Sequence, residues 1–261
     1  MFLHRTILLA AGLALLGSLG PACGAPRDPD LEKRAFNAVA KLEAERAAEP
    51  QPNANVTTPP RKEAALKSYS NAETRRILNA VPGTGNRLWA ELRTQQGTIK
   101  CALNDVDAPQ TVANFVGLAT GQLEWRDGSR GPMVRRPFYD GLTFHRVVAN
   151  FVIQTGNPGR ETGGGPGWTI ARETRASAAF DKAGAIAMID SGADSHGSQF
   201  FITVRPDTTL KARYAAFGVC QDLEIVRAIS NGAQVPSQSG KPSSIPRDPV
   251  KIFSVKVTRG D

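Results

Sequence analysis

The sequence has little of what metal-binding and membrane-spanning proteins require. Only three Cys and three His occur among its 261 residues, and their scatter along the chain argues against a zinc or haem protein. The one sustained apolar stretch is Met1–Leu19, and its uncharged part, Thr6–Leu19, is too short for a spanning helix of about 20 residues. We therefore expect no metal, no cofactor and no transmembrane helix.

Clustered charge is also missing. The chain carries 32 Lys and Arg against 24 Asp and Glu, a net charge of +8. No run of five or six like charges occurs, and the basic pairs Arg75–Arg76 and Arg135–Arg136 are isolated. A nucleic-acid surface needs basic residues gathered on one face, with aromatic residues between them for single strands. We expect a solvated basic surface and no nucleic-acid partner.

The first 23 residues have the pattern of a secretory signal. His4 and Arg5 form a weak basic start, and Ile7–Leu19 supplies an apolar core of the usual length. A small residue, Ala22, then precedes Cys23. This arrangement resembles a bacterial lipobox, in which the Cys becomes the lipidated first residue of the mature protein.

The lipobox resemblance is imperfect, because Gly20 and Pro21 stand where Leu and Ser or Ala are usual. Two outcomes stay open: lipid on Cys23, or ordinary cleavage near Ala22 or Ala25. Either outcome predicts an exported protein. Lipidation would hold it at an envelope membrane, whereas simple cleavage would release it into the periplasm, and we expect no other membrane contact.

Between the signal and the folded domain, residues 24–85 have the composition of a stalk. Asp30–Glu49 is rich in Ala, Glu, Lys and Arg and favours a partly formed helix. Gln51–Pro60 contains three prolines and is typical of an extended linker. Lys62–Val81 offers a second helix, with Asn71 as its candidate N-cap.

From residue 86 to residue 261 the pattern is one of short strands separated by Gly and Pro. Such a pattern predicts an antiparallel barrel or sandwich, since closure of the sheet removes exposed edges. The eight expected strands are Leu88–Leu92, Gly97–Leu103, Leu142–Val148, Phe151–Gln154, Ala185–Ile189, Gln199–Val204, Tyr214–Cys220 and Val250–Val257. Two expected helices, Pro109–Thr120 and Leu223–Ile229, would cap the open ends of a barrel.

Four segments of this domain carry a family resemblance. They are FHRVVANFVIQTGNP (Phe144–Pro158), HGSQFFIT (His196–Thr203), YAAFG (Tyr214–Gly218) and APQTVANFVGLATG (Ala108–Gly121). Together they resemble the cyclophilins, the proline isomerases, over about two-thirds of the chain. The resemblance implies a mainly β fold: a closed eight-stranded antiparallel barrel capped by two α-helices. It also implies peptidyl-prolyl cis-trans isomerase activity on proline-containing polypeptides.

The resemblance also assigns roles to individual residues. Arg146 matches the catalytic arginine, and Gln154 would hold its guanidinium in place. Asp190 stands where Asn is usual, Ile189 where Ala is usual, and Val152 where Met is usual. The positions implied for the proline pocket and the adjoining peptide groove are Phe151, Val152, Ile189, Asp190, Gln199, Phe201, Leu210 and Tyr214.

An arginine suits this reaction, because rotation about an X–Pro bond breaks no covalent bond. The barrier of roughly 18–20 kcal/mol arises because the amide nitrogen shares its lone pair with the carbonyl. A guanidinium that donates to the nitrogen of the twisted amide stabilises it over both planar forms, and arginine keeps its proton. No nucleophile, metal or cofactor is needed.

Several alternatives stay open. A non-catalytic module that binds proline peptides would use the same groove, and an envelope scaffold protein would use the stalk. Cys101 and Cys220 are expected on strands that the resemblance makes possible neighbours, so they form either a structural disulfide or two buried free thiols. The sequence carries no signal of oligomeric state, and a monomer is the working expectation.

Overall fold

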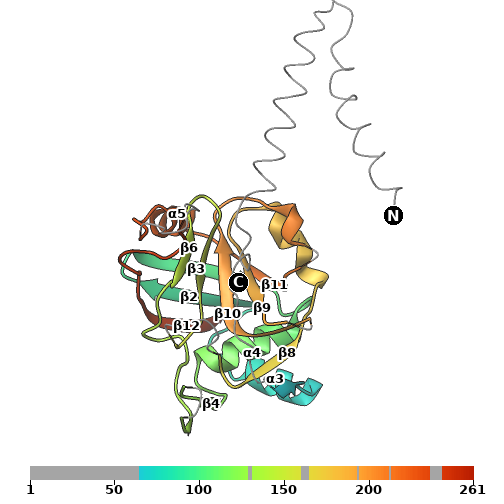
Figure 1. Cartoon of the computed structure of the whole chain (residues 1–261). Coiled ribbons are helices and arrows are strands. Elements are labelled where there is room, and N and C mark those ends of the chain that lie inside the picture. The colour runs from blue at the N-terminus through green and yellow to red at the C-terminus, as the bar shows by residue number, and fades with distance from the viewer. Residues whose placement is uncertain (1–64, 129–130, 160–164, 193, 212, 236–242) are drawn as a thin grey trace, which may run out of the picture. The chain divides into compact units, whose positions relative to one another are not determined.

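The computed structural model describes residues 65–261 apart from 129–130, 160–164, 193, 212 and 236–242 (Figure 1). The predicted signal, Cys23, the first stalk helix and the linker all lie outside the described residues. In the described part of the chain, no helix is both long and apolar enough to cross a membrane.

β-Strands dominate the described residues. Their bounds are β1 (Ala65–Lys67), β2 (Arg87–Thr94), β3 (Gly97–Leu103), β4 (Trp125–Arg126), β5 (Met133–Val134), β6 (Arg146–Val148), β7 (Val152–Thr155), β8 (Trp168–Ala171), β9 (Ala185–Asp190), β10 (Ser195–Thr203), β11 (Ala216–Cys220) and β12 (Ile252–Gly260). The main sheet runs β1-β8-β10-β9-β11-β3-β2-β12, and β7 joins β6 to β10. All pairs are antiparallel except β1 with β8, and β4 and β5 form a separate ribbon.

The prediction of a closed barrel is wrong, because within the described residues no strand ladder joins β12 to β6. Thr143 and Lys251 form only an isolated bridge there. The predicted strand Leu142–Val148 is interrupted: the N–H of Ile252 donates to the carbonyl of Leu142 at 2.8 Å, whereas β6 pairs with β7. The chain changes its pairing partner at residue 145, so no continuous strand can close the sheet.

Three α-helices, one more than predicted, accompany the sheet in the described residues: α3 (Asn71–Asn79), α4 (Pro109–Ala119) and α5 (Leu223–Ser230). Figure 1 shows α4 and α5 apart on the sheet, with α3 beside α4. Helix α4 is buried from Thr111 to its end at Ala119, and Pro109 occupies its first turn, where no backbone donor is lost.

The N-cap of α3 is Ser70, not Asn71. The Ser70 hydroxyl accepts from the N–H of Glu73 at 3.1 Å, and the Glu73 carboxylate accepts from the N–H of Ser70 at 2.9 Å. This reciprocal capping box satisfies two backbone donors at the start of the helix. The helix therefore begins at Asn71.

Residues 65–81, which the sequence analysis placed in the stalk, are packed into the folded domain. Tyr69, Ile77, Leu78 and Val81 are buried in the main core, and β1 pairs with β8. Because the domain includes these residues, a stalk cannot extend to residue 85.

A buried amide joins this segment to the rest of the domain. The Asn114 side-chain oxygen, on α4, accepts hydrogen bonds from the Tyr69 hydroxyl at 2.9 Å and from the Trp168 indole at 3.0 Å. The Asn114 amide group donates to the carbonyl of Gly197 at 2.9 Å. The Lys67 ammonium lies over both the Tyr69 and the Trp168 rings. Residues 65–69 are thus tied to α4, β8 and β10.

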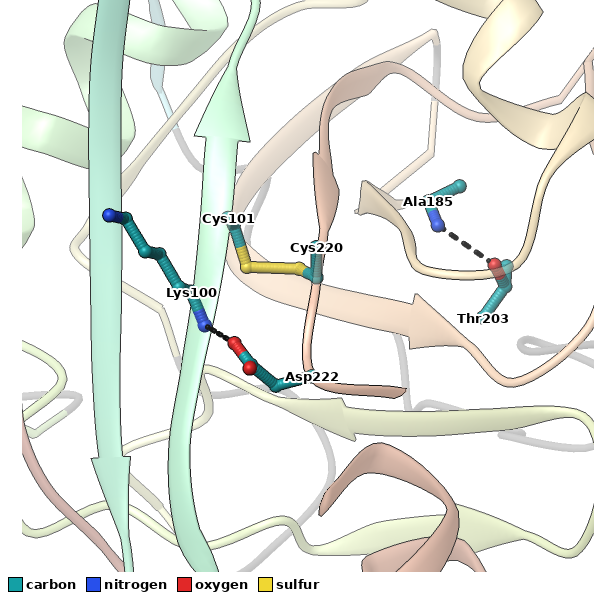
Figure 2. Close-up of a disulfide and its surroundings, with 6 residues drawn as sticks. All are labelled: Lys100, Cys101, Ala185, Thr203, Cys220 and Asp222. Carbon is teal, nitrogen blue, oxygen red and sulfur yellow. Dashed lines mark hydrogen bonds between the residues drawn. A yellow bond between two sulfur atoms is a disulfide. The ribbon is translucent and has the colours of Figure 1, made fainter. Parts of the chain in front are cut away.

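The structure joins Cys101 of β3 to Cys220 of β11 in a disulfide (Figure 2). The two residues lie directly opposite each other in the antiparallel pair and are buried in the main core. Nearby, the backbone N–H of Lys100 donates to the Asp222 carboxylate at 3.1 Å. Of the two states left open by the sequence, the structure therefore has the bonded one.

Candidate active site

The candidate site is built on the face of the sheet opposite the main core. Successive side chains of a strand point to opposite faces. On β10, Phe200 and Ile202 pack in the main core, whereas Phe201 packs in a second apolar cluster. We call this second group the outer cluster; its buried members are Val148, Phe151, Val152, Phe180, Ala185, Ala187, Ile189, Phe201, Leu210, Tyr214 and Ala216.

The structure brings together six of the predicted pocket residues in the outer cluster. They are Phe151, Val152, Ile189, Phe201, Leu210 and Tyr214. The rings of Phe201 and Tyr214 meet edge to face with centroids 5.1 Å apart, a favourable arrangement for two aromatic side chains. Leu210 ends the short 3-10 helix η2 (Thr208–Leu210), which precedes Tyr214.

Sequence reasoning missed other members of this cluster. Phe180, from the 3-10 helix η1 (Arg175–Asp181), stacks on Phe201 at 6.4 Å between ring centroids. No motif marked Phe180. Ala185 and Ala187 could have been found, because they alternate with Ile186 along β9 and so share the face of Ile189.

A row of polar side chains lies on the same face. Arg146 and Gln154 are opposite each other across β6 and β7, and Gln154 is opposite Phe201 across β7 and β10. An Arg146 guanidinium nitrogen (Nη1) donates to Gln154 Oε1 at 3.4 Å, and Gln154 Nε2 donates to Gln199 Oε1 at 3.1 Å. Gln154 therefore contacts both Arg146 and Gln199, and its role beside Arg146 stays a prediction.

The Arg146 side chain is charged although its residue is only 9 % exposed. Burial lowers the pKa of its guanidinium to about 10, and the nearby Tyr214 acts in the opposite direction. The group therefore keeps its proton at neutral pH. Low local polarity strengthens any hydrogen bond that this cation donates.

Asp190 lies beside the outer cluster and not within it. It ends β9 directly after Ile189, and its carboxylate accepts a hydrogen bond from the N–H of Gly192 at 3.0 Å. The residue is half-buried. Its charge is thus placed at the end of the strand that lines the cluster.

Two histidines near the site are neutral at pH 7. Burial and then the charge of Arg146 lower the pKa of His145 to about 4. Burial and then the charge of Arg172 lower the pKa of His196 to about 3. The positive charge in the row of polar side chains therefore comes from Arg146.

The family model for the cyclophilin type peptidyl-prolyl cis-trans isomerase/CLD matches residues 89–257, well over half of the chain. The chain belongs to the cyclophilin family. This cyclophilin is a peptidyl-prolyl cis-trans isomerase, the first of the three functions that the sequence left open.

Relatives of this cyclophilin carry the same activity in their names. The peptidyl-prolyl cis-trans isomerase A of Mycobacterium tuberculosis is 42% identical over 174 residues, which are 65% of this chain and 91% of the relative. The peptidyl-prolyl cis-trans isomerase B of Bacillus subtilis is 43% identical over 126 residues, 48% of this chain and 78% of the relative.

Solved structures share the fold. A cyclophilin type peptidyl-prolyl cis-trans isomerase of Cryptosporidium parvum superposes with a TM-score of 0.55 at 23% identity, covering 67% of this chain and 100% of that one. A second structure of that protein, in the presence of the dipeptide Ala-Pro, gives a TM-score of 0.54 at 23% identity, covering 66% of this chain and 99% of that one. This cyclophilin therefore has the mainly β cyclophilin fold.

Proposed function

We propose that Arg146 is the catalytic residue of this isomerase and that the outer cluster grips the proline ring. One observation carries the proposal: a buried, protonated guanidinium bound to Gln154 shares a sheet face with a cluster of apolar side chains. The apolar side chains suit a proline ring, and the guanidinium suits the amide nitrogen next to it. The Ala-Pro dipeptide present with the Cryptosporidium parvum relative supports a proline-containing peptide as the substrate.

The proposed chemistry follows from the geometry. A planar X–Pro amide has no free lone pair on nitrogen, whereas the twisted amide does. A donor held at a fixed place beside the pocket interacts with that lone pair only in the twisted state. Such an interaction lowers the barrier without tightening the binding of either planar form. Gln154 keeps the guanidinium in position, and it is itself held by Gln199.

Replacement of Arg146 by Ala tests the proposal. Arg146→Ala is expected to lower kcat/KM by at least about 100-fold, a loss of roughly 2.7 kcal/mol of transition-state stabilisation. The measurement is a proline-isomerisation assay on an end-blocked peptide. Arg93→Ala, which removes an exposed arginine of β2, serves as the control and should keep full activity. An Arg146→Ala protein that is folded and fully active would contradict the assignment.

We further propose that the isomerase acts on exported polypeptides, as a monomer held at an envelope membrane through lipid on Cys23. The signal-like first 23 residues support export. A buried disulfide supports it as well, because disulfides persist in oxidising compartments and are rare in reducing ones.

Labelling with a fatty acid tests the anchor. The mature wild-type protein is expected to carry the label and to sediment with membranes. Cys23→Ser should lose the label and leave the membrane fraction, or fail to be processed, with isomerase activity unchanged. A mature, exported wild-type protein without label would make simple secretion the correct interpretation.

A further inference from the structure

Arg172, directly after β8, binds two segments that are far apart in the sequence. One of its guanidinium nitrogens (Nη1) donates to the backbone carbonyl of Arg213 at 2.6 Å, and the other (Nη2) forms an ion pair with the Asp194 carboxylate. The backbone N–H of Arg172 also donates to the carbonyl of Asp194, at 2.8 Å. The Arg172 side chain is only 19% exposed, whereas that of Asp194 is 77% exposed.

Both segments adjoin the outer cluster. Asp194 belongs to the turn between β9 and β10, which begins just after Ile189 and Asp190. Arg213 immediately precedes Tyr214, the aromatic residue that packs on Phe201. Ile189 and Tyr214 are both members of the outer cluster. The guanidinium of Arg172 therefore joins two walls of the cluster, the turn after Ile189 and the segment before Tyr214. A backbone hydrogen bond from the N–H of Met188 to the carbonyl of Ala215, at 3.0 Å, joins the neighbouring residues of the same two segments.

The wall that carries Tyr214 has little regular structure of its own. Between β10 and β11 the described residues contain only the short helix η2, and the N–H groups of Arg213 and Tyr214 both donate to the carbonyl of Leu210. A charge-assisted hydrogen bond to the Arg213 carbonyl is stronger than one between neutral groups. It fixes the backbone one residue before the tyrosine ring.

The turn that carries Asp194 also depends on this contact. Asp194 adopts a left-handed backbone conformation, φ 54°, which Asp and Asn tolerate better than most residues. Its carbonyl and its carboxylate are both bound by Arg172. Loss of the guanidinium would remove the bond to the Asp194 carboxylate. The turn would keep the backbone hydrogen bond from the N–H of Arg172 to the Asp194 carbonyl and the bonds between Ser191 and Ser195 and between Gly192 and Ser195.

We propose that Arg172 is a positioning residue that holds the turn after Ile189 and the segment before Tyr214 in place and thereby sets how tightly the proline ring is held. The inference rests on the proposed function of the outer cluster. A looser pocket holds the planar and the twisted amide equally less well. Loss of such uniform binding raises KM and leaves kcat nearly unchanged, in contrast to the loss of Arg146.

The experiment compares kcat and KM of full-length variants on a neutral, end-blocked peptide that contains Ala-Pro. Arg172→Ala is expected to raise KM by about tenfold with kcat within about twofold of wild type. Arg172→Lys keeps the charge but can satisfy only one partner well, so it should raise KM by about threefold.

Two further variants separate positioning from charge. Asp194→Asn removes a negative charge, whereas Arg172→Ala removes a positive one. Both variants weaken the contact between Arg172 and Asp194, so Asp194→Asn should also raise KM, by about threefold. It also keeps the inference testable if Arg172→Ala does not fold. Arg175→Ala removes an exposed arginine three residues further on and should leave KM unchanged.

An unchanged KM in folded Arg172→Ala, or in Asp194→Asn, overturns the inference. A fall in kcat that matches the rise in KM also overturns it, since it would place Arg172 in the transition-state contacts. Arg146→Ala distinguishes this failure from that of the proposed function. If Arg146→Ala is inactive while Arg172→Ala and Asp194→Asn both have the KM of the wild type, the positioning role of Arg172 fails and the proposed function stands.

Discussion

Loss of the Cys101–Cys220 disulfide is expected to lower the free energy of unfolding by up to about 5 kcal/mol. The bond closes a loop with a sequence separation of 119 residues, and in the chain-entropy model a loop of that length greatly restricts the unfolded chain. The variant Cys101→Ala/Cys220→Ala, compared with wild type in urea unfolding, measures the effect. Alanine is suitable at both positions because it places no hydroxyl in the buried site.

Thiol titration and a reductant provide the controls. Wild-type protein with added reductant should unfold like the double variant, and the reductant should not affect the variant. Unfolded in the absence of reductant, the full chain should titrate no thiol beyond Cys23. Titration of Cys101 and Cys220 as two further thiols would show that they are free in the protein.

Ile77→Ala is expected to lower the free energy of unfolding by about 2–5 kcal/mol, the usual range for removing a large buried aliphatic side chain. Ile77 lies on α3, is fully buried in the main core and approaches Gly117 of α4. If residues 65–85 were an independent stalk, the substitution would leave the unfolding of the isomerase domain unchanged. The measurement is urea unfolding: a lower transition midpoint at an unchanged slope (m-value) reports a lower free energy of unfolding.

Arg75→Ala is the matched control, since Arg75 is exposed on the same helix. It should change the free energy of unfolding by less than about 0.5 kcal/mol. A fragment that begins at Leu88 should be less stable than one that begins at residue 65, because it lacks the side chains of Tyr69, Ile77, Leu78 and Val81. Equal stability of the two fragments would contradict the packing described for α3.

The sequence predicted the central strands well because their apolar residues alternate or form short runs between turn residues. Gly97–Leu103 is reproduced residue for residue as β3, and Ala185–Ile189 differs from β9 by one residue. β8 was missed, since only four residues form it and a glycine-rich segment precedes it. β1 was missed because Ala65–Lys67 falls within Lys62–Val81, which was predicted as one helix; the structure has a strand there and begins the helix only at Asn71.

The closure of the sheet and the place of α3 could not be read from local pattern. Closure of the sheet depends on whether the residues around His145 pair with β12 or with β7. Tertiary packing decides this pairing, and the local sequence does not. The apolar residues of α3 form a thin stripe, which is equally typical of a helix in a stalk. What decides its place is the buried contact of Tyr69 with Asn114 on α4, 45 positions further along the chain.

The candidate site was predicted through a resemblance and not from spacing. Arg146, Gln154 and Phe201 come from three strands, and only the pairing of those strands places them together. Arg172 and Phe180 carried no signal. The partners of Arg172 are a backbone carbonyl and a turn aspartate, neither of which has a fixed sequence distance from it.

The shared use of β9 and β10 by the main core and the outer cluster limits how this enzyme can be re-engineered. A larger side chain at Ala187 would press on a strand whose neighbouring residue, Met188, packs in the main core. Variants with substitutions in the outer cluster will therefore lose stability as they gain new peptide preferences. Variants with substitutions at exposed positions beside the outer cluster can change substrate preference without disturbing the core. One such position is Arg213, whose side chain lies over the Tyr214 ring.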